Sequence, residues 1–218
     1  MPKTADPNTA SASQREQAYQ ALRRLLVLQQ VQPGQRLREP EWAERIGVHR
    51  SALREAFARL EAEGLIERGA QTGYFVPKLT AEDVVEVAKL RLALESLAID
   101  EICAQAEPAL SQLKRAVDEF EQFAGGGYYL GTLEADRRFH ESLVEAARMR
   151  RLSALYHRAP LPLIHGDAED RAVWRDACDR TLAEHRQILT SLAKRDADGA
   201  KRVLRQHLDQ RPTLPLVR

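Results

Sequence analysis

The chain has few cysteines, no long apolar run and almost no net charge, and each of these absences excludes a class of protein. No apolar stretch approaches the roughly 18 residues that a membrane span requires, so we expect a soluble protein. The first dozen residues are small and polar without the apolar core of a secretory signal, and we expect a flexible tail over residues 1–12. The two cysteines, Cys103 and Cys178, are single and far apart, which excludes a disulfide framework or a CxxC motif and favours a cytoplasmic location.

A chain of 218 residues is long enough for two ordinary domains, and its composition is that of a globular protein. The net charge of +1 is spread unevenly along it. Residues 1–79 carry 12 Lys and Arg against 9 Asp and Glu, whereas residues 80–218 carry 21 against 23. The positive bias at the N-terminal end permits nucleic-acid binding there, although a bias of this size does not establish it.

Three helices are expected before residue 65. Capping-box spacing at residues 13–16 precedes an apolar stripe, which predicts a first helix over residues 13–30. A short second helix has Pro40 in its first turn, and the apolar spacing of residues 50–64 predicts a third. Only Gly47-Val48-His49 separates the last two helices, which is the short turn of a helix-turn-helix.

The hydrophobic period changes after the third helix. Residues 65–76 contain two short strand patterns joined by a loop with a glycine at each end, which is typical of a β-hairpin. We interpret this hairpin as a wing. The sequence therefore predicts a winged helix-turn-helix domain over residues 13–77 and a second domain over residues 80–212, which begins at a threonine suited to cap a helix.

The second domain shows helical periodicity throughout and no convincing strand pattern. The expected helices cover residues 80–106, 109–124, 131–147, 149–158, 169–194 and 197–211. The default architecture for such a pattern is an antiparallel bundle. The fold class is thus mainly α, an N-terminal winged helix-turn-helix followed by a C-terminal antiparallel all-α bundle of six or seven helices.

The third helix has the pattern of a DNA-reading helix. Its apolar residues can face inward while Arg50, Ser51 and Arg54 project from its N-terminal half, the two arginines one turn apart. A guanidinium can donate two hydrogen bonds to the O6 and N7 atoms of guanine. The alternative is that both arginines are solvated surface residues, paired with Glu55 or Glu41.

The stretch QPGQRLREPEWAERIGVHRSALREAFARLEAEGLIERGAQTGYFV resembles the winged helix-turn-helix of GntR-type bacterial regulators. The family pattern is a PG-x-x-L start, then LGVSR-x-x-VREAL-x-x-L-x-x-EGL and a G-x-F-V wing. The resemblance implies a homodimer on a palindromic DNA operator, with Arg50 and Arg54 at base edges. It also implies that Gly73 lies at the wing tip near the minor groove.

The sequence departs from this family pattern at three positions. His49 replaces the usual Ser or Thr at the N-cap of the third helix, where it is a weaker cap and a candidate phosphate contact. Ala52 replaces a frequent proline. Pro40 stands where some relatives carry another DNA-contacting arginine, so that contact is not expected here.

Asp136, His140, His185 and His207 are the candidate metal ligands. Asp136 and His140 are four positions apart, which places a carboxylate and an imidazole on one helix face, while the other two histidines lie on later helices. In a bundle these residues can converge on a divalent transition metal such as Zn²⁺, Ni²⁺ or Mn²⁺. Spacing alone supports this only weakly, because a single histidine is more often a surface or hydrogen-bonded residue and Asp136 with His140 alone would be an ordinary helical ion pair.

Three stretches of the second domain, EVAKLRLALESLAIDEICA, EADRRFHESLVEAA and AEHRQILTSLAKRDADGAKRVLRQHL, resemble the FCD effector domain of the FadR-like branch of the GntR family. In metal-binding members the ligands fall on a D-x-x-x-H pair, on the His of an EH-x-x-I-L segment and on a His about 22 residues later. This resemblance implies the four ligands named above. Two departures are Arg148-Met149, which replaces a common Gly-Asn turn, and the segment His157–Gly166, which follows no family pattern.

A metal that accepts five or six ligands keeps open positions beside four protein ligands, which suits a small carboxylate effector. Arg91 is the candidate second contact for that carboxylate, and an Arg91–Glu95 helical ion pair is the equally weighted alternative. The expected function is therefore a ligand-responsive transcriptional regulator, with repression as the commoner family behaviour.

The rival functions are a metal-dependent hydrolytic enzyme and a helical adaptor whose winged helix binds protein. The chain has neither the Glu-x-x-His motif of di-iron bundles nor a G-x-S-x-G nucleophile motif. We therefore expect no enzymatic activity.

Overall fold

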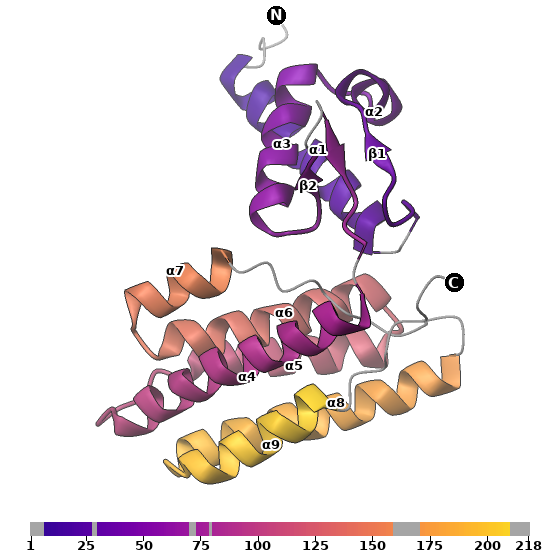
Figure 1. Ribbon diagram of the computed structural model, residues 1–218. Coiled ribbons are helices and arrows are strands. Elements are labelled where there is room, and N and C mark those ends of the chain that lie inside the picture. Colours follow the sequence, from indigo (N-terminus) through magenta and orange to yellow (C-terminus); the bar gives the residue numbers. More distant parts are fainter. Residues whose placement is uncertain (1–6, 28–29, 70–72, 79, 159–170, 210–218) are drawn as a thin grey trace, which may run out of the picture. The chain divides into compact units, whose positions relative to one another are not determined.

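The computed structural model describes residues 7–27, 30–69, 73–78, 80–158 and 171–209. Described residues up to 78 form one compact unit, and those from Thr80 to His157 and from 171 to 209 form a second (Figure 1). The first unit is a winged helix-turn-helix and the second an all-helical bundle, so the predicted fold class is confirmed. Within these ranges, every helix is too short or too polar to cross a membrane.

The first helix, α1, spans Pro7–Val27. Its predicted start at Ser13 is wrong, and so is the predicted tail for residues 7–12, which are helical. Proline has a preset φ that suits the first helical position, so the helix can start at Pro7, upstream of the capping-box pattern. The described helix runs to Val27, and Gln30, its predicted end, is not helical. Residues 1–6 and 28–29 lie outside the described part of the chain.

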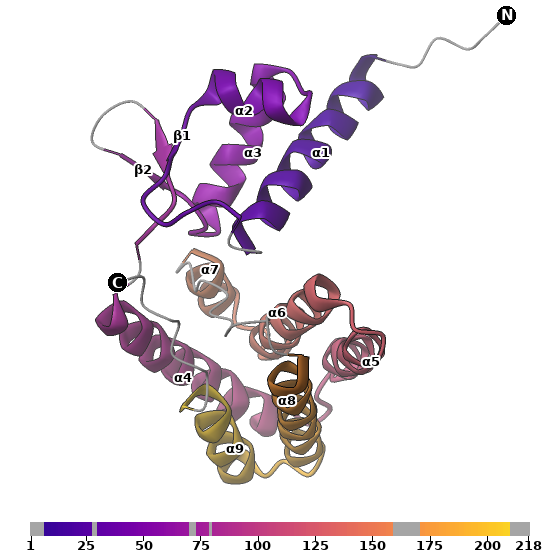
Figure 2. The same ribbon diagram turned by 90° about the vertical axis from the view of Figure 1, so that its right-hand side faces the viewer.

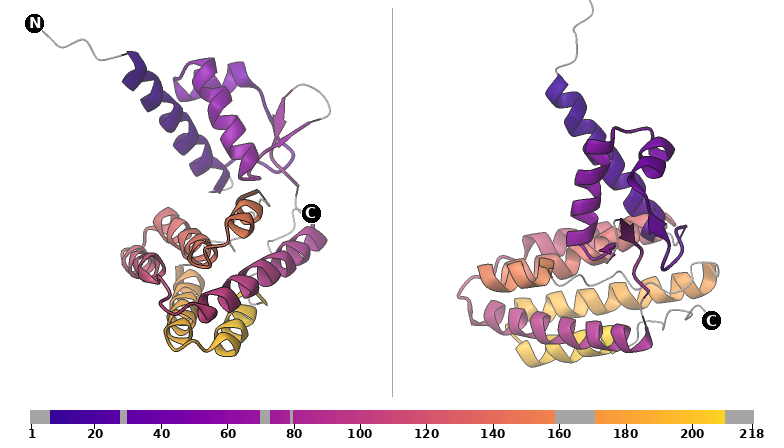
Figure 3. Two further views of the ribbon diagram at one scale, coloured as in Figure 1. Left: turned by 90° about the vertical axis from the view of Figure 1, so that its left-hand side faces the viewer. Right: turned by 45° about the horizontal axis from the view of Figure 1, so that its top comes forward.

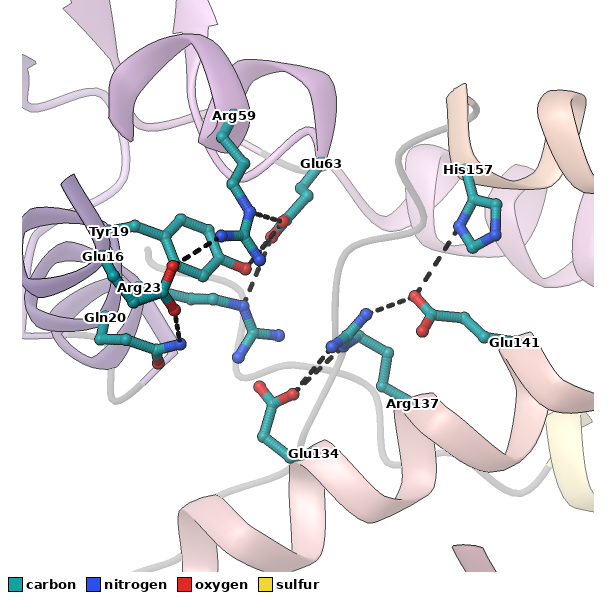
Figure 4. A network of polar contacts seen from close by, with 10 residues as sticks. All are labelled: Glu16, Tyr19, Gln20, Arg23, Arg59, Glu63, Glu134, Arg137, Glu141 and His157. Carbon is teal, nitrogen blue, oxygen red and sulfur yellow. Dashed lines mark hydrogen bonds and ion pairs between the residues drawn. The ribbon is translucent and has the colours of Figure 1, made fainter. Parts of the chain in front are cut away.

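A polar network fastens α1 to the third helix of the unit, α3 (Arg50–Ala62) (Figure 4). The Tyr19 hydroxyl donates to Glu63 at 2.7 Å, and the Arg59 guanidinium lies 3.4 Å from the centre of the Tyr19 ring. Burial and then the hydrogen bond to Glu63 raise the pKa of Tyr19 to about 12. Arg23 adds an ion pair to Glu63 at 3.4 Å, so the network stabilises the packing of α1 on α3.

Helix α2 (Glu39–Ile46) and α3 form the predicted helix-turn-helix. Gly47 ends α2 in the left-handed conformation at φ +76°, which glycine adopts without a steric penalty, and its N–H donates to the carbonyls of Ala43 and Glu44. Val48 and His49 complete the turn before Arg50 starts α3. The turn is as short as the sequence predicts.

The wing is a three-stranded antiparallel sheet of β1 (Arg36–Leu37), β2 (Glu67–Arg68) and β3 (Tyr74–Phe75), in the order β1-β3-β2. In this register Phe75 faces Arg36 on one side and Glu67 on the other. Two strands lie inside the predicted patterns and are shorter than predicted. Strand β1 was not predicted, because two residues are too few to show the alternation that marks a strand.

One apolar core lies beneath the helix-turn-helix. It is contributed by α1, α2, α3 and the sheet, and its most buried members are Leu22, Leu37, Leu53, Phe57, Leu60 and Ile66. Because α3 supplies three of them from its inner face, its outer face is held toward solvent by the packing of the whole unit.

In its described residues the second unit has the six predicted helices: α4 (Ala81–Ala104), α5 (Ser111–Gly125), α6 (Tyr129–Ala146), α7 (Arg150–Arg158), α8 (Arg171–Ala193) and α9 (Ala197–Asp209). Thr80 caps α4 through a capping box, since its hydroxyl accepts from the Asp83 N–H at 3.1 Å and its own N–H donates to the Asp83 carboxylate at 2.7 Å. The bond from the Thr80 N–H and a bond from the Thr80 hydroxyl at 2.9 Å, both donated to the Asp83 carboxylate, lower the pKa of Asp83. Arg148, between α6 and α7, adopts the left-handed conformation at φ +56°.

The long helices of the bundle pack side by side (Figures 2 and 3). Helix α6 packs against α5 and α4, and α8 packs against α9 and α5. Fully buried apolar residues from five helices fill the interior, among them Ile99, Ile102, Leu113, Phe139, Leu143, Ile188, Leu192 and Leu204. The inner faces of α4, α6, α8 and α9 therefore meet in one core, and polar residues on those faces are brought together.

Candidate functional site

The exposed end of α3 carries the residues predicted to read DNA. Arg50, Ser51 and Arg54 are all exposed, whereas Leu53 and Phe57 on the opposite face are fully buried. The structure thus places the two arginines together on the outer surface of the helix-turn-helix. This is the arrangement that a helix needs in order to present donors to a DNA groove.

Arg54 has an acidic partner, Glu39 of α2, whose carboxylate lies 3.3 Å from the Arg54 Nε. The partners weighed from the sequence, Glu55 and Glu41, pair instead with Arg15 and with Arg38. The Arg54 side chain remains 65% exposed, and an ion pair this exposed is weak. The arginine is therefore not committed to Glu39.

His49 and Gly73 are the two other residues predicted to contact DNA. His49 is exposed at the N-cap of α3, and its side chain makes no capping hydrogen bond, as expected from the replacement of Ser or Thr. Gly73 has φ +128° next to β3, a conformation that other residues rarely adopt. The tip of the predicted hairpin, residues 70–72, lies outside the described residues.

Asp136, His140, His185 and His207 come together inside the bundle. Helix α6 supplies the first two, α8 supplies His185 and α9 supplies His207, and each side chain is at least nine-tenths buried. One ligand atom from each of the four residues lies within 4.8 Å of the others. The Nε2 atoms of His140 and His207 are 3.1 Å apart, and the Asp136 Oδ1 is 3.7 Å from the Nε2 of His140 and 3.5 Å from that of His185.

Two carboxylates hold the far sides of two of these imidazole rings. Glu95 of α4 lies 2.7 Å from the Nδ1 of His140, and Glu184 of α8 lies 2.8 Å from the Nδ1 of His207. An ionised carboxylate only accepts, so in each pair the Nδ1 carries the hydrogen and donates it. The Nε2 atom of each ring is then the one that faces the other ring.

The third imidazole is oriented by packing. The His185 ring stacks on Phe139 with centroids 3.8 Å apart and 16° between the planes, and it meets the edge of Phe120 at 5.5 Å. Because aromatic contacts of this kind restrict ring rotation, His185 is held with its Nε2 toward Asp136.

Arg91 and Glu95 form a buried ion pair one turn apart on α4, with the Arg91 Nε 2.9 Å from the Glu95 Oε1. This is the alternative that the sequence left open beside an effector contact. The same oxygen accepts a hydrogen bond from the Tyr156 hydroxyl at 2.9 Å. Burial raises the pKa of Glu95, but its contacts with His140 and Arg91 lower it by more, so the pKa lies well below the ordinary value and the carboxylate is ionised.

The donor set suits a divalent transition metal. One carboxylate oxygen and three imidazole nitrogens are typical ligands of Zn²⁺ and of similar ions. With metal bonds of about 2.0–2.2 Å, neighbouring ligand atoms lie about 3.0–3.5 Å apart, close to the separations found here. In metal centres, the ring nitrogen of a ligand histidine that does not bind the metal also regularly donates to a carboxylate, as the Nδ1 atoms of His140 and His207 do here.

Several partners of the site were not predicted from the sequence. Glu184 directly precedes His185, and this spacing gave no sign that it would contact His207, 23 residues later. No sequence pattern indicated that Tyr156 would contact the site. His157, left unassigned, is exposed and pairs with Glu141 (Figure 4) and with Glu145, both on α6. Residues 159–166 of this segment, including His165, lie outside the described residues.

Comparison with protein families gives two matches that together cover most of the chain. Residues 14–76 match the family described as bacterial regulatory proteins, gntR family, and residues 86–210 match the FCD domain. The chain is also similar to an uncharacterised HTH-type transcriptional regulator of Bacillus subtilis, YdhC, with 30% identity over 195 residues, 88% of this chain and 87% of that protein. It is 28% identical over 207 residues to the HTH-type transcriptional repressor RspR of Escherichia coli, with 89% of this chain and 86% of RspR covered.

Among solved structures, the fold resembles that of Escherichia coli McbR/YncC, with a TM-score of 0.69. The superposition covers 90% of this chain and 94% of the other at 20% identity. At this identity the likeness concerns the fold alone.

Proposed function

The chain belongs to the GntR family of bacterial regulatory proteins and carries an FCD domain, and we propose on that basis that it is a metal-containing repressor released from DNA by a small carboxylate. The family and the relatives are transcriptional regulators rather than enzymes, so the hydrolytic alternative is set aside. Repression is named for RspR, one of the relatives. Since its target is DNA, we propose that it acts in the cytoplasm.

For DNA recognition, we propose that α3 enters the major groove of a palindromic operator. Arg50 and Arg54 would donate to base edges, Ser51 and His49 would contact the backbone or bases at the helix start, and the wing at Gly73 would approach the minor groove. The exposure of both arginines over a rigid apolar base supports this role.

The observation that carries the metal proposal is the buried convergence of Asp136, His140, His185 and His207. A buried carboxylate surrounded by imidazoles is costly unless its charge is compensated. We propose that these residues hold one Zn²⁺, Ni²⁺ or Mn²⁺ ion. When bound, such an ion offers positive charge and open coordination positions to an anionic ligand.

Arg91 is the proposed second contact of the effector. Its guanidinium presents five N–H donors, and the bond to Glu95 uses the Nε. Glu95 in turn bonds His140, so Arg91 is one residue removed from a proposed metal ligand. An effector carboxylate between Arg91 and the metal would therefore sit where both positive groups attract it.

A second copy of the chain is the proposed partner of the helical domain. Leu90 and Leu97 of α4 are 51% and 42% exposed and lie seven residues apart, with the exposed Ala93 between them on the same helix face. Burying such leucines between two copies would stabilise a homodimer. A palindromic operator requires two recognition helices at a fixed spacing, which a homodimer supplies.

The regulatory response would follow from differential affinity. An effector that binds one arrangement of the dimer more tightly than the DNA-bound arrangement must weaken DNA binding by the same factor. The effector therefore needs no direct contact with DNA.

Operator binding with defined metal content tests this proposal. An operator is selected from random duplexes with the purified protein, and its affinity is measured by fluorescence anisotropy for metal-free protein and after addition of Zn²⁺, Ni²⁺ or Mn²⁺. We expect one member of a panel of small carboxylates to weaken binding at least fivefold for the metal-loaded protein and to have no effect on its His185→Ala variant. If no carboxylate shifts the affinity with any metal, the proposed response is wrong.

A further inference from the structure

We propose that Glu95 and Glu184 are positioning residues of the metal centre, which fix the Nε2 atoms of His140 and His207 as the metal-binding atoms. This inference rests on the proposed metal site. A histidine offers two nitrogens to a metal, and a free imidazole exchanges its hydrogen between them. In each of the two rings, the structure places a carboxylate at the Nδ1 atom.

The argument for His140 comes from α4. The Glu95 Oε2 lies 2.7 Å from the Nδ1 of His140, and both residues are at least 98% buried, so water does not compete for this hydrogen bond. The Nδ1 hydrogen is thereby fixed. The Nε2 is deprotonated when it binds metal, and it lies 3.7 Å from the Asp136 carboxylate oxygen.

The argument for His207 is parallel and comes from a different helix. Glu184 of α8 lies 2.8 Å from the Nδ1 of His207, and the Nε2 of that ring is 3.1 Å from the Nε2 of His140. Glu184 directly precedes His185 on α8. The same turn of α8 therefore orients the His207 ring through Glu184 and supplies the proposed ligand His185. Carboxylates from two different helices, α4 and α8, thus favour the same tautomer in His140 and in His207.

Glu95 has a further property that makes its replacement informative. Its Oε1 accepts from both the Arg91 Nε and the Tyr156 hydroxyl, each at 2.9 Å. In Glu95→Gln the amide oxygen is required by these two donors, so the amide NH₂ faces the Nδ1 of His140. A donor at that position selects the tautomer with hydrogen on Nε2, which blocks metal binding at this atom.

The first experiment measures Zn²⁺ affinity by competition with a chromophoric chelator, for the wild type, Glu95→Gln and Glu184→Gln. The control is Glu119→Gln on α5, whose carboxylate is ion-paired with Arg138 and takes no part in the cluster. We expect about 10- to 100-fold weaker Zn²⁺ binding for the two positioning variants and no change for the control, since loss of an outer hydrogen-bond partner has effects of this size. Circular dichroism establishes that each variant is folded.

The results separate this inference from the metal proposal. Wild-type protein that binds no Zn²⁺ would overturn the metal site itself. Wild-type protein that binds Zn²⁺, together with Glu95→Gln and Glu184→Gln variants of unchanged affinity, would overturn only the positioning role.

A second measurement needs no variant. In the ¹⁵N-labelled, Zn²⁺-loaded wild type, long-range ¹H–¹⁵N spectra of the imidazole rings distinguish a protonated nitrogen from a metal-bound one. We expect protonated Nδ1 and Zn²⁺-bound Nε2 for both His140 and His207. Zn²⁺ on the Nδ1 of either ring would overturn the assignment.

Discussion

Removal of the Glu39 carboxylate should strengthen operator binding, because Glu39 competes with DNA for Arg54. The two side chains form an ion pair at 3.3 Å, and Arg54 must leave it before its guanidinium can donate to a base. Side-chain exposures of 65% and 31% place the pair at the surface, where such pairs contribute about 0.2–1 kcal/mol. The Glu39→Gln variant should therefore bind operator up to about fivefold more tightly.

The Arg54→Ala variant should bind about 5- to 150-fold more weakly, which corresponds to the roughly 1–3 kcal/mol of a bidentate base contact. In the double variant the gain from Glu39→Gln should disappear, since the arginine that it releases is absent. The matched control is Glu16→Gln, because Glu16 pairs at 3.1 Å with Arg59 at the other end of the same helix. It reports the general effect of removing an acidic group from the surface.

The operator affinities of these four variants and of the wild type are measured by fluorescence anisotropy with a labelled operator at one fixed salt concentration. Equal binding by Glu39→Gln would refute the competition, and weaker binding would mean that Glu39 positions Arg54 for its base. A gain of the same size for Glu16→Gln would show that the effect is general repulsion between acidic residues and DNA phosphates.

Three further predictions concern stability and assembly. Folding raises the pKa of Tyr19 from 10 to about 12, so the stability that Tyr19 contributes is present below about pH 10 and should be lost toward pH 12. Tyr19→Phe should reduce this loss, as measured by denaturant unfolding followed by tryptophan fluorescence in a background that keeps Trp42 and replaces Trp174 with Phe. Arg148→Gly should raise the free energy of unfolding by up to about 1 kcal/mol, because Arg148 holds a left-handed conformation that glycine adopts freely, and a loss of stability would contradict this. Leu97→Glu should shift the protein toward monomer in analytical ultracentrifugation and weaken operator binding, whereas an unchanged dimer would exclude this face as the interface.

The helix-turn-helix was largely predictable because its signals are local. The apolar spacing of Leu53, Phe57 and Leu60 fixes which side of α3 is buried, and Gly47 marks the end of the preceding helix. The start of α1 was missed because the capping-box pattern at Ser13 marks one possible start, whereas Pro7, which suits the first helical position, begins the helix upstream. Strand β1 was missed because its pairing with β3 is set by tertiary contacts rather than by its own two residues.

The candidate metal site was predictable only in part. The spacing of Asp136 and His140 places both on one helix face, but that His185 and His207 should join them was implied by the resemblance to the FCD domain. The contact between Glu95 and His140 joins residues 45 positions apart, and the period of each helix does not determine which face meets which neighbour. The same spacing that indicated an Arg91–Glu95 ion pair therefore gave no sign that this pair adjoins the histidines.

Anomalous diffraction from crystals of the purified protein, collected on both sides of the Zn, Ni and Mn absorption edges, tests the metal centre most directly. The account predicts one anomalous peak per chain, about 2.0–2.2 Å from the Nε2 atoms of His140, His185 and His207 and from one oxygen of Asp136. Crystals grown with the metal present that show no peak among these four side chains would contradict it.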